Sequence, residues 1–576
     1  MSRSRRALRL HLALLGLGGC IWLSKGADPD GDGVPSIEDC APSDPERHDP
    51  TTFYLDEDQD GYGDPDQSRD ACAIPQGYAP EGGDCDDGDP DIHPTAADLC
   101  GDGLDSACDG EPCSASLNDA YTVLFGEDGD AVGSSVLVAP DLTGDGQPDL
   151  VIGAEDHVAS GGTAGELSVI GGGPIYQGAS PIDALAALTV VGRVDSSVGS
   201  NLGHATASGA DLDGDGQNDL LVSAHRLGEG ASLAGGVYLL DGPLAGGDEA
   251  VPVEEAAERR WIGTTSLERA GYGLALADLD GDGAVALAVG AYLWADSDRL
   301  TLGAVYLMDD PMGDGGAAAD LGSDDRISGA SDDDYFGATL GVVGDTDGDG
   351  MQDLAISATG NDDGATGGGA VYLIDGPPER PTTITDVASQ ILLGTSDGAS
   401  VGSALAAAGD VDGDGLDDVW VGARDAGDGG SSSGSVYLVT GGWLEGAPSV
   451  RRLDEATTAL VGDNEDQLGS GIVGDLDVDG DGELDLAVGA MGRNEDLGHA
   501  GAVYVLPGPF PAGTAQISAI ARRYVGPDAY AFAGRHLALG YGLAGTDEVD
   551  LVVASTDATV SNIESGAVYL LAGLGP

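Results

Sequence analysis

Basic residues are scarce in this sequence, and lysine is almost missing. Only 22 Lys and Arg residues stand against 101 Asp and Glu, the formal charge is -79, and Lys25 is the single lysine. A chain without a basic patch is not expected to bind nucleic acid. The Gly-rich stretches also lack the lysine with which a P-loop holds phosphates.

Histidines are few and scattered, which argues against a catalytic centre. The eight histidines form no His-x-x-x-His pair, and those after residue 121 fall in different parts of a long repetitive region. Carboxylates are so numerous that no acid/base pair stands out. The sequence therefore predicts a protein that is not an enzyme.

Asp-rich loops of nine residues recur at intervals of about 65 to 70 residues. In the loop that begins at Asp211, carboxylates stand at positions 1, 3, 5 and 9, and Gly216 stands at position 6. A short apolar run of buried-strand length follows each loop. Repetition at a fixed period predicts a propeller or a solenoid. The candidate ligands are Asp141, Thr143, Asp145 and Asp149; Asp211, Asp213, Asp215 and Asp219; Asp278, Asp280 and Asp282; Asp345, Asp347, Asp349 and Asp353; Asp410, Asp412, Asp414 and Asp418; and Asp477, Asp479, Asp481 and Asp485.

The spacing within each loop predicts a calcium site. Oxygen ligands at alternate positions can surround one hard cation, and a glycine at position 6 lets the backbone turn. An EF-hand needs a glutamate at position 12, but an apolar residue, Ile152 in the first copy, stands there. We therefore expect a loop between two strands.

Two further elements recur in register with the loops. A glycine turn precedes each loop, as in Leu202-Gly203 and Phe336-Gly337, and we assign it to Tyr272-Gly273 in the third copy. A strand with a tyrosine, such as Tyr238, follows. The pattern gives seven units of about four strands between residues 121 and 576.

The Phe-Gly or Leu-Gly turn, the Asp loop and the Gly-Ala strand end together resemble the FG-GAP repeats of integrin alpha subunits, over about four fifths of the chain. The resemblance implies an all-β fold, a seven-bladed β-propeller with calcium in inter-strand loops on one face. Whether the segment 121–125 closes the last blade stays open.

The copies differ in their ligands, so we expect about six calcium sites of unequal strength. Loops beginning at Asp211, Asp345, Asp410 and Asp477 keep all four carboxylates and should bind strongly. The first loop has Thr143 at position 3 and the third has Ala286 at position 9, so both should be weaker. The seventh unit keeps Asp550 but has lost the first ligands, and no calcium is expected there.

The first 20 residues read as an export signal that ends in a bacterial lipobox-like sequence. Arginines precede an apolar stretch that is too short for a membrane span. Leu17-Gly18-Gly19-Cys20 predicts a lipid on Cys20 and a membrane anchor. An ordinary cleaved signal and a retained anchor are the alternatives.

Residues 21–113 are expected to form a tether and a Cys/Asp-rich metal-binding module, which has few apolar residues and should have little regular structure. It is similar to thrombospondin type 3 repeats and to metal-binding Cys-Asp repeats of bacterial surface proteins. Copper or zinc bound by the cysteines is the alternative to disulfides. The candidate calcium ligands are Asp28, Asp30, Asp32, Asp56, Asp58, Asp60 and Asp64, and the disulfide candidates are Cys40, Cys72, Cys85, Cys100, Cys108 and Cys113.

Residues 114–120 are expected to be a linker to the propeller at 121–576. The function predicted is a calcium-binding module for adhesion at a bacterial cell surface, with a glycan or a protein as its ligand. Candidate ligand-binding loops are 156–162, 225–231, 291–299, 360–367, 424–432 and 492–499. A polysaccharide-active enzyme working in the propeller channel and a purely structural envelope protein are the alternatives.

Overall fold

The structure is a computed structural model of the whole chain. It describes residues 51–94, 108 and 114–574, apart from 57, 59, 72–73, 86, 89, 91, 118–119, 160–161, 174–177, 196–197, 247–248, 297–300, 314–315, 445–448, 495–497, 546–547, 561–562 and 573. The chain divides into two compact units, Met1–Pro112 and Cys113–Pro576, which are described separately.

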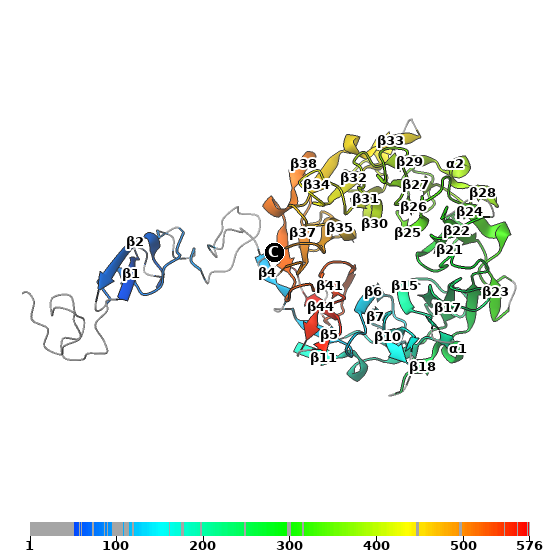
Figure 1. Ribbon diagram of the computed structural model, residues 1–576, viewed down its shortest axis with the longest axis horizontal. Coiled ribbons are helices and arrows are strands. Elements are labelled where there is room, and N and C mark those ends of the chain that lie inside the picture. Colours follow the sequence, from blue (N-terminus) through cyan, green and yellow to red (C-terminus); the bar gives the residue numbers. More distant parts are fainter. Residues whose placement is uncertain are drawn as a thin grey trace, which may run out of the picture. The chain divides into compact units, whose positions relative to one another are not determined.

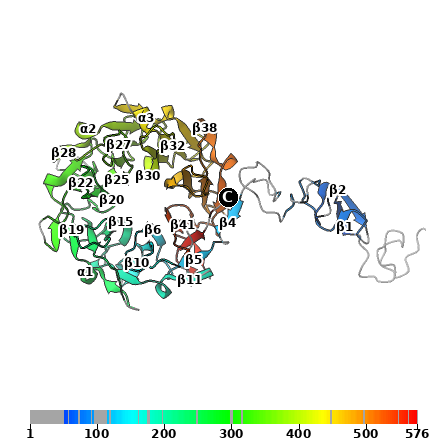
Figure 2. The same cartoon turned by 180° about the vertical axis from the view of Figure 1, so that it is seen from behind.

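The second unit is a ring of five-stranded sheets whose innermost strands surround a central axis (Figures 1 and 2). The all-β propeller expected from the repeats is confirmed, and its described residues form seven such sheets, here called blades 1 to 7. From the axis outwards, blade 1 is β6 (Val132–Ala139), β7 (Asp149–Ala154), β10 (Glu166–Ile170), β12 (Leu188–Val191), β18 (Val251–Pro252); blade 2 is β15 (Leu202–Ser208), β16 (Leu220–Ala224), β17 (Gly236–Leu240), β19 (Arg259–Ile262), β23 (Ala318–Asp320); blade 3 is β20 (Leu274–Ala277), β21 (Ala286–Ala291), β22 (Ala304–Met308), β24 (Arg326–Ser328), β28 (Thr382–Thr383); blade 4 is β25 (Phe336–Val342), β26 (Leu354–Ala358), β27 (Ala370–Ile374), β29 (Gln390–Leu393), β33 (Val450–Arg452); blade 5 is β30 (Val401–Gly409), β31 (Asp418–Ala423), β32 (Ser435–Val439), β34 (Thr458–Val461), β38 (Gly513–Gln516); blade 6 is β35 (Leu468–Leu476), β36 (Asp485–Ala490), β37 (Ala502–Leu506), β39 (Arg522–Val525), β4 (Ser114–Ser116); and blade 7 is β40 (Leu537–Tyr541), β41 (Val549–Ser555), β44 (Ala567–Ala572), β5 (Thr122–Phe125), β11 (Gly178–Pro181).

Short elements lie between these strands. Three two-stranded hairpins and three one-turn α-helices occur among the described residues, besides four short 3-10 helices. They are β8 (Val158–Ala159) with β9 (Gly162–Thr163), β13 (Val194–Asp195) with β14 (Val198–Gly199), β42 (Thr559–Val560) with β43 (Ile563–Glu564), α1 (Val253–Ala256), α2 (Ile384–Val387) and α3 (Gly441–Leu444).

The fifth, outermost strand of each blade comes from the blade that follows it in the ring. The chain leaves β17 of blade 2, forms β18 and α1, and returns to blade 2 as β19. β18 pairs in parallel with β12 of blade 1, whereas β19 pairs antiparallel with β17. The four antiparallel strands per unit agree with the expectation, and the exchanged strand links neighbouring blades.

The N-terminal strand closes the ring. β5 pairs antiparallel with β44 near the C-terminus, so that Val123 stands opposite Tyr569 (Figure 1). Residues 114–116, inside the expected linker, form β4 and pair in parallel with β39 of blade 6. The first strands of the second unit therefore complete its last two blades.

Apolar side chains pack between neighbouring blades. In blade 4 the second and third strands, β26 and β27, are buried along their whole length, because both faces of the sheet meet another sheet. The tyrosines of the third strands belong to this core and are at most 6% exposed: Tyr238, Tyr306, Tyr372, Tyr437, Tyr504 and Tyr569.

The glycine turn of blade 3 is Ala270-Gly271, so the assignment to Tyr272-Gly273 was wrong. Ala270 forms a parallel bridge with Gly235, as Phe336 does with Gly303 in the next blade. Gly271 has φ 89°, and a Cβ there would lie 2.9 Å from the Gly236 carbonyl oxygen. Gly271 and Gly273 are two residues apart, so the sequence allowed either of them to be the turn glycine. The close approach of the Gly236 carbonyl to Gly271 identifies the first of them.

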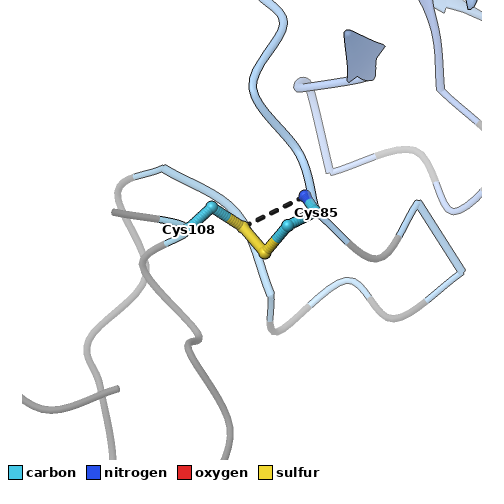
Figure 3. Close-up of a disulfide and its surroundings, with 2 residues drawn as sticks. All are labelled: Cys85 and Cys108. Atoms are coloured by element: carbon cyan, nitrogen blue, oxygen red, sulfur yellow. Dashed lines mark hydrogen bonds between the residues drawn. A yellow bond between two sulfur atoms is a disulfide. The ribbon is translucent and has the colours of Figure 1, made fainter. Parts of the chain in front are cut away.

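The first unit contains a three-stranded sheet of β1 (Thr51–Leu55), β2 (Asp64–Ala71) and β3 (Tyr78–Ala79), in the order β2-β1-β3. A disulfide joins Cys85 to Cys108, whose Cα atoms are 5.6 Å apart (Figure 3). No helix among the described residues has the length and apolarity to cross a membrane. Several predicted residues lie outside the described ones: Cys20, Asp28, Asp30, Asp32, Cys40, Cys72, Cys100 and Cys113.

Candidate metal sites

The six predicted calcium loops all occupy the same place in their blades. Each joins the innermost strand to the second strand, as the loop from Asp211 to Asp219 joins β15 to β16. Because the innermost strands are equivalent around the ring, the six loops lie at one end of the propeller. The structure thus brings the predicted ligands of each loop together and repeats that arrangement from blade to blade.

Backbone hydrogen bonds hold the carboxylates in a common geometry. In all six loops the position 1 carboxylate accepts the N–H of the position 6 glycine, at 2.8 to 3.0 Å. The position 5 carboxylate accepts the N–H of position 7, at 2.8 to 2.9 Å. The position 6 glycines have φ between 87° and 96°, which side chains disfavour. The turn is therefore formed by the chain itself.

Carboxylate oxygens converge within the loop of blade 2. Ligand atoms of Asp211, Asp213 and Asp215 all lie within 4.8 Å of one another. Asp213 forms a second such group with Asp241 and Glu258. Calcium takes six to eight oxygen ligands, so additional carboxylates near the loop suit it.

Sequence reasoning missed these additional carboxylates. Asp241 and Asp375 both follow the tyrosine strand directly and precede a glycine, which was a usable signal. Burial raises the pKa of Asp241, and the charges of Asp213 and Asp215 raise it further. Asp375 contributes in the same direction to the raised pKa of Asp347. Both loops therefore hold more negative charge than their nine residues supply.

The aspartate at position 9 is buried wherever it is present. Asp149, Asp219, Asp353, Asp418 and Asp485 are at most 1% exposed. In blade 5, Asp418 accepts the N–H of Val411 at 3.1 Å and that of Gly441, beyond the third strand, at 2.9 Å. The same carboxylate therefore fastens the loop to the blade.

The donor set fits a calcium ion. Burial raises the pKa of Asp219 and of Asp353 to about 6 and that of Asp418 to about 7, with nearby carboxylates adding to the shift. Oδ1 of Asp353 is buried and makes no hydrogen bond in the described structure. A buried carboxylate oxygen without a donor is what a cation ligand requires. The side chains at positions 1, 3, 5 and 9 would hold the ion.

The incomplete loops differ as their sequences suggest. Thr143 donates its hydroxyl to Asp149 at 3.2 Å, so a side-chain oxygen remains at position 3 of the first loop. In the third loop Ala286 supplies no carboxylate, and Gln352 of blade 4 instead accepts the N–H of Asp278 at 2.9 Å. In the seventh unit Asp550 still accepts the N–H of Ala544 at 2.9 Å. Fastening the loop therefore does not depend on the other ligands.

The first unit contains a second type of acidic cluster. Carboxylates of Asp56, Asp58 and Asp60 lie within 4.8 Å of one another, and Asp58 forms a further group with Asp84 and Asp87. Asp64 accepts a hydrogen bond from the Gln67 amide at 2.6 Å. The disulfide occupies the sulfur atoms of Cys85 and Cys108, so neither is a free thiolate for copper or zinc.

The comparison with protein families agrees with this geometry. Residues 132–170, 202–240, 336–374 and 468–506 match the model of the FG-GAP repeat. The chain carries FG-GAP repeats. Each matched segment runs from the first to the third strand of a blade and includes one acidic loop. Residues 84–112, around the disulfide, match the Cu-binding MopE model of a metal-binding motif.

Curated relatives are integrin alpha subunits. Integrin alpha-PS2 of Drosophila melanogaster is 30% identical over 233 residues, which are 39% of this chain and 15% of the relative. Human integrin alpha-IIb is 32% identical over 231 residues, 39% of this chain and 20% of the relative. Integrin alpha-7 of Rattus norvegicus is 36% identical over 154 residues, which are 27% of this chain and 12% of the relative. The chain thus matches a small part of each relative's length.

Substituting the position 9 aspartates should separate the two roles of this side chain. One role is to accept backbone hydrogen bonds that hold the loop, and the other is to bind the ion. Asp418→Asn in blade 5 and Asp550→Asn in blade 7 each remove a buried acceptor, which costs about 1–3 kcal/mol. Asp418→Asn should cost more than Asp550→Asn in calcium and the same in a chelator, because only the blade 5 loop has the other ligands. Denaturant unfolding measures both. Equal costs in calcium would contradict an ion at Asp418.

Proposed function

We propose that this protein is an exported, calcium-stabilised propeller that serves as a binding or adhesion module at a bacterial cell surface. The observation that carries the proposal is the acidic loop, repeated six times with the same hydrogen bonds. A rigid ring with ions at one end presents the loops of its other end in fixed positions. The integrin alpha relatives support adhesion as the role of that face.

The ligand-binding surface is proposed to lie at the end opposite the calcium loops. Segments between the second and third strands, including 225–231 and 424–432, emerge at that end, because the acidic loops occupy the other end of the second strands. A cavity of about 540 Å³ lies along the innermost strands, with Tyr272, Tyr292 and Tyr335 in its lining. Aromatic rings at a cavity mouth suit a sugar or a protein side chain.

The cavity gives no support to a hydrolase of polysaccharides. Such enzymes need two carboxyl groups on either side of the scissile bond. Serines, threonines, tyrosines, histidines and arginines line the cavity, and its described lining contains no aspartate or glutamate. A binding role therefore accounts better for this surface than glycoside hydrolysis.

Lipid attachment at Cys20 is proposed as the tether, on the basis of the lipobox-like sequence. Mass spectrometry of the mature N-terminus should find a diacylated Cys20 as the first residue. An unmodified N-terminus after a cleaved signal would indicate that the protein is secreted and has no lipid anchor.

A glycan array tests the binding role. We expect saturable binding to a subset of glycans in millimolar calcium, lost in a chelator, with the bound glycans recovered intact. Asp418→Asn should weaken glycan binding only at calcium concentrations so low that the propeller is no longer fully stabilised. Release of shortened glycans would establish the enzyme instead, and binding to neither glycans nor extracellular proteins would favour a structural role.

A further inference from the structure

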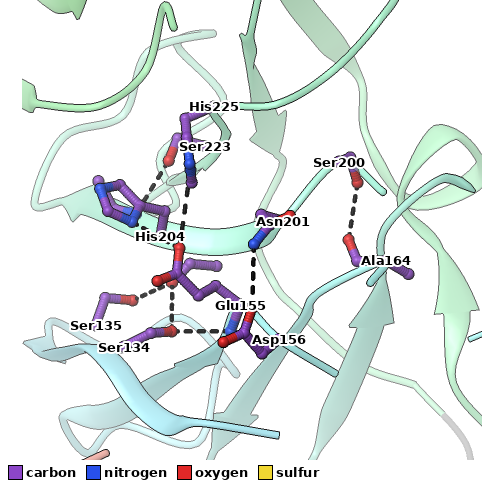
Figure 4. A network of polar contacts seen from close by, with 12 residues as sticks. Ser134, Ser135, Glu155, Asp156, Ala164, Ser200, Asn201, His204, Ser223 and His225 are labelled. Atoms are coloured by element: carbon purple, nitrogen blue, oxygen red, sulfur yellow. Dashed lines mark hydrogen bonds and ion pairs between the residues drawn. The ribbon is translucent and has the colours of Figure 1, made fainter. Parts of the chain in front are cut away.

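Two histidines and a glutamate lie close to one another on neighbouring blades (Figure 4). Glu155 follows β7 of blade 1, His204 lies in β15 of blade 2, and His225 follows β16 of blade 2. Their ligand atoms lie within 4.8 Å of one another. Two blades contribute ligands, and Glu155 is far from His225 in the sequence. No short sequence motif therefore predicts the cluster.

We propose that Glu155, His204 and His225 bind a transition-metal ion of the zinc type, separate from the calcium loops. Nδ1 of His204 is 2.8 Å from Oε2 of Glu155, and Nδ1 of His225 is 3.8 Å from the same oxygen. Tetrahedral ligands of zinc, with bonds of about 2.0–2.2 Å, stand about 3.4 Å apart. The two distances to Glu155 Oε2 differ from that spacing by about 0.6 Å and 0.4 Å.

His225 carries the clearest sign of a missing partner. It is 8% exposed, and its buried Nδ1 has no hydrogen-bond partner in the described structure. Buried ring nitrogens are normally satisfied, and an unsatisfied one needs an explanation such as an ion.

The backbone around the cluster is held in place. Ser134 accepts the N–H of Glu155 at 3.0 Å, and Ser223 accepts the N–H of Ala205, next to His204, at 3.0 Å (Figure 4). These serines come from the innermost strand of blade 1 and the second strand of blade 2. The ligands therefore stand on strands and their ends, which position side chains more firmly than long loops.

The ligand types select the kind of ion. The positive charges of Arg226, Arg269 and Arg535 nearby oppose any divalent cation and do not distinguish zinc from calcium. A hard ion such as calcium needs several oxygen ligands and would find one carboxylate here. Zinc and its neighbours bind imidazole strongly, so two histidines and one glutamate favour them.

Three protein ligands leave a coordination position free, and it would face the channel. His204 also lines the cavity of about 540 Å³, together with Arg535 and His536. A site with three protein ligands and an open position exchanges its fourth ligand. The arginine beside it would favour an anionic donor, such as a carboxylate or phosphate oxygen of a molecule in the channel.

Zinc titration of the full chain in millimolar calcium tests the proposal, because calcium then occupies the acidic loops. Calorimetry should show one tight equivalent of zinc, and Co²⁺ should give visible absorption bands typical of imidazole ligation. His225→Gln and Glu155→Gln should each weaken that equivalent more than about 100-fold, since even residues behind a ligand are worth 10–100-fold.

His499→Gln is the matched control. His499 also follows the second strand of its blade, but its Nδ1 lies 3.0 Å from the Gly492 carbonyl oxygen instead of a carboxylate. It should keep the tight equivalent, and all variants should melt like the parent without zinc. A parent without a tight equivalent would overturn the proposal. So would loss of the ion in His157→Gln, whose ring contacts Asp130 and Glu166 in blade 1.

Discussion

Removing calcium is expected to lower the melting temperature of the purified protein by about 10 °C or more. A loop that binds calcium only when folded adds about 2.7 kcal/mol at an ion concentration 100 times its dissociation constant. The four complete loops would together add about 11 kcal/mol. Melting followed by circular dichroism, with and without a chelator, measures the difference, and added calcium should restore it.

The size of the effect follows from the crowding of like charges. Each complete loop holds four carboxylates, and position 9 is buried, as Asp418 shows at 0% exposure. Without an ion, burial and then the neighbouring carboxylates raise the pKa of Asp418 to about 7. A divalent cation cancels two of the four charges. The folded state therefore gains much more from calcium than the unfolded chain does.

High salt provides the control for general charge repulsion. If the formal charge of -79 reflects only a salty habitat, then molar sodium chloride should restore stability in the chelator as well as calcium does. Site binding predicts recovery at millimolar calcium and little recovery with salt. Calcium bound per chain should also approach six for the propeller loops, after subtraction of the first unit. An unchanged melting temperature in the chelator would contradict the calcium role.

The sequence was sufficient for features that repeat and insufficient for those that occur once. The spacing from Asp211 to Asp219 recurs with a strand on either side, so the loops and the sheets could be predicted together. The fifth strands could not, because β18 has two residues and pairs with a blade that was already complete in the pattern. The turn of blade 3 was misplaced because Gly271 and Gly273 both fit the local sequence.

Long-range contacts set the remaining limit. The pairing of Cys85 with Cys108 is one of 15 that six cysteines allow, and nothing in their spacing selects it. The cluster of Glu155, His204 and His225 joins two blades, and its residues are far apart in the sequence. Position 9 was predicted as a ligand, but its burial and its bond to Gly441 depend on the third strand of the blade.

Removal of the closing strands β4 and β5 is expected to have the other large effect on stability, and two truncations, one before and one after these strands, test it. A chain that begins at Ser114 keeps β4 and β5, and its propeller should melt as in the full-length protein. A chain that begins at Gly126 loses both strands. Blade 7 then lacks the partner of β44, and blade 6 lacks its outermost strand.

The shorter chain should lose cooperative unfolding, because the missing strands hold the two ends of the ring together. Leu117 and Leu124 are at most 1% exposed, so their removal opens the cores of blades 6 and 7. The unpaired edge of β44 is also a template for pairing with another chain, and self-association is expected by light scattering. A synthetic peptide of residues 114–125 should restore the monomeric state and the cooperative melting transition. Identical melting curves for the two truncations would show that the ring closes without these strands.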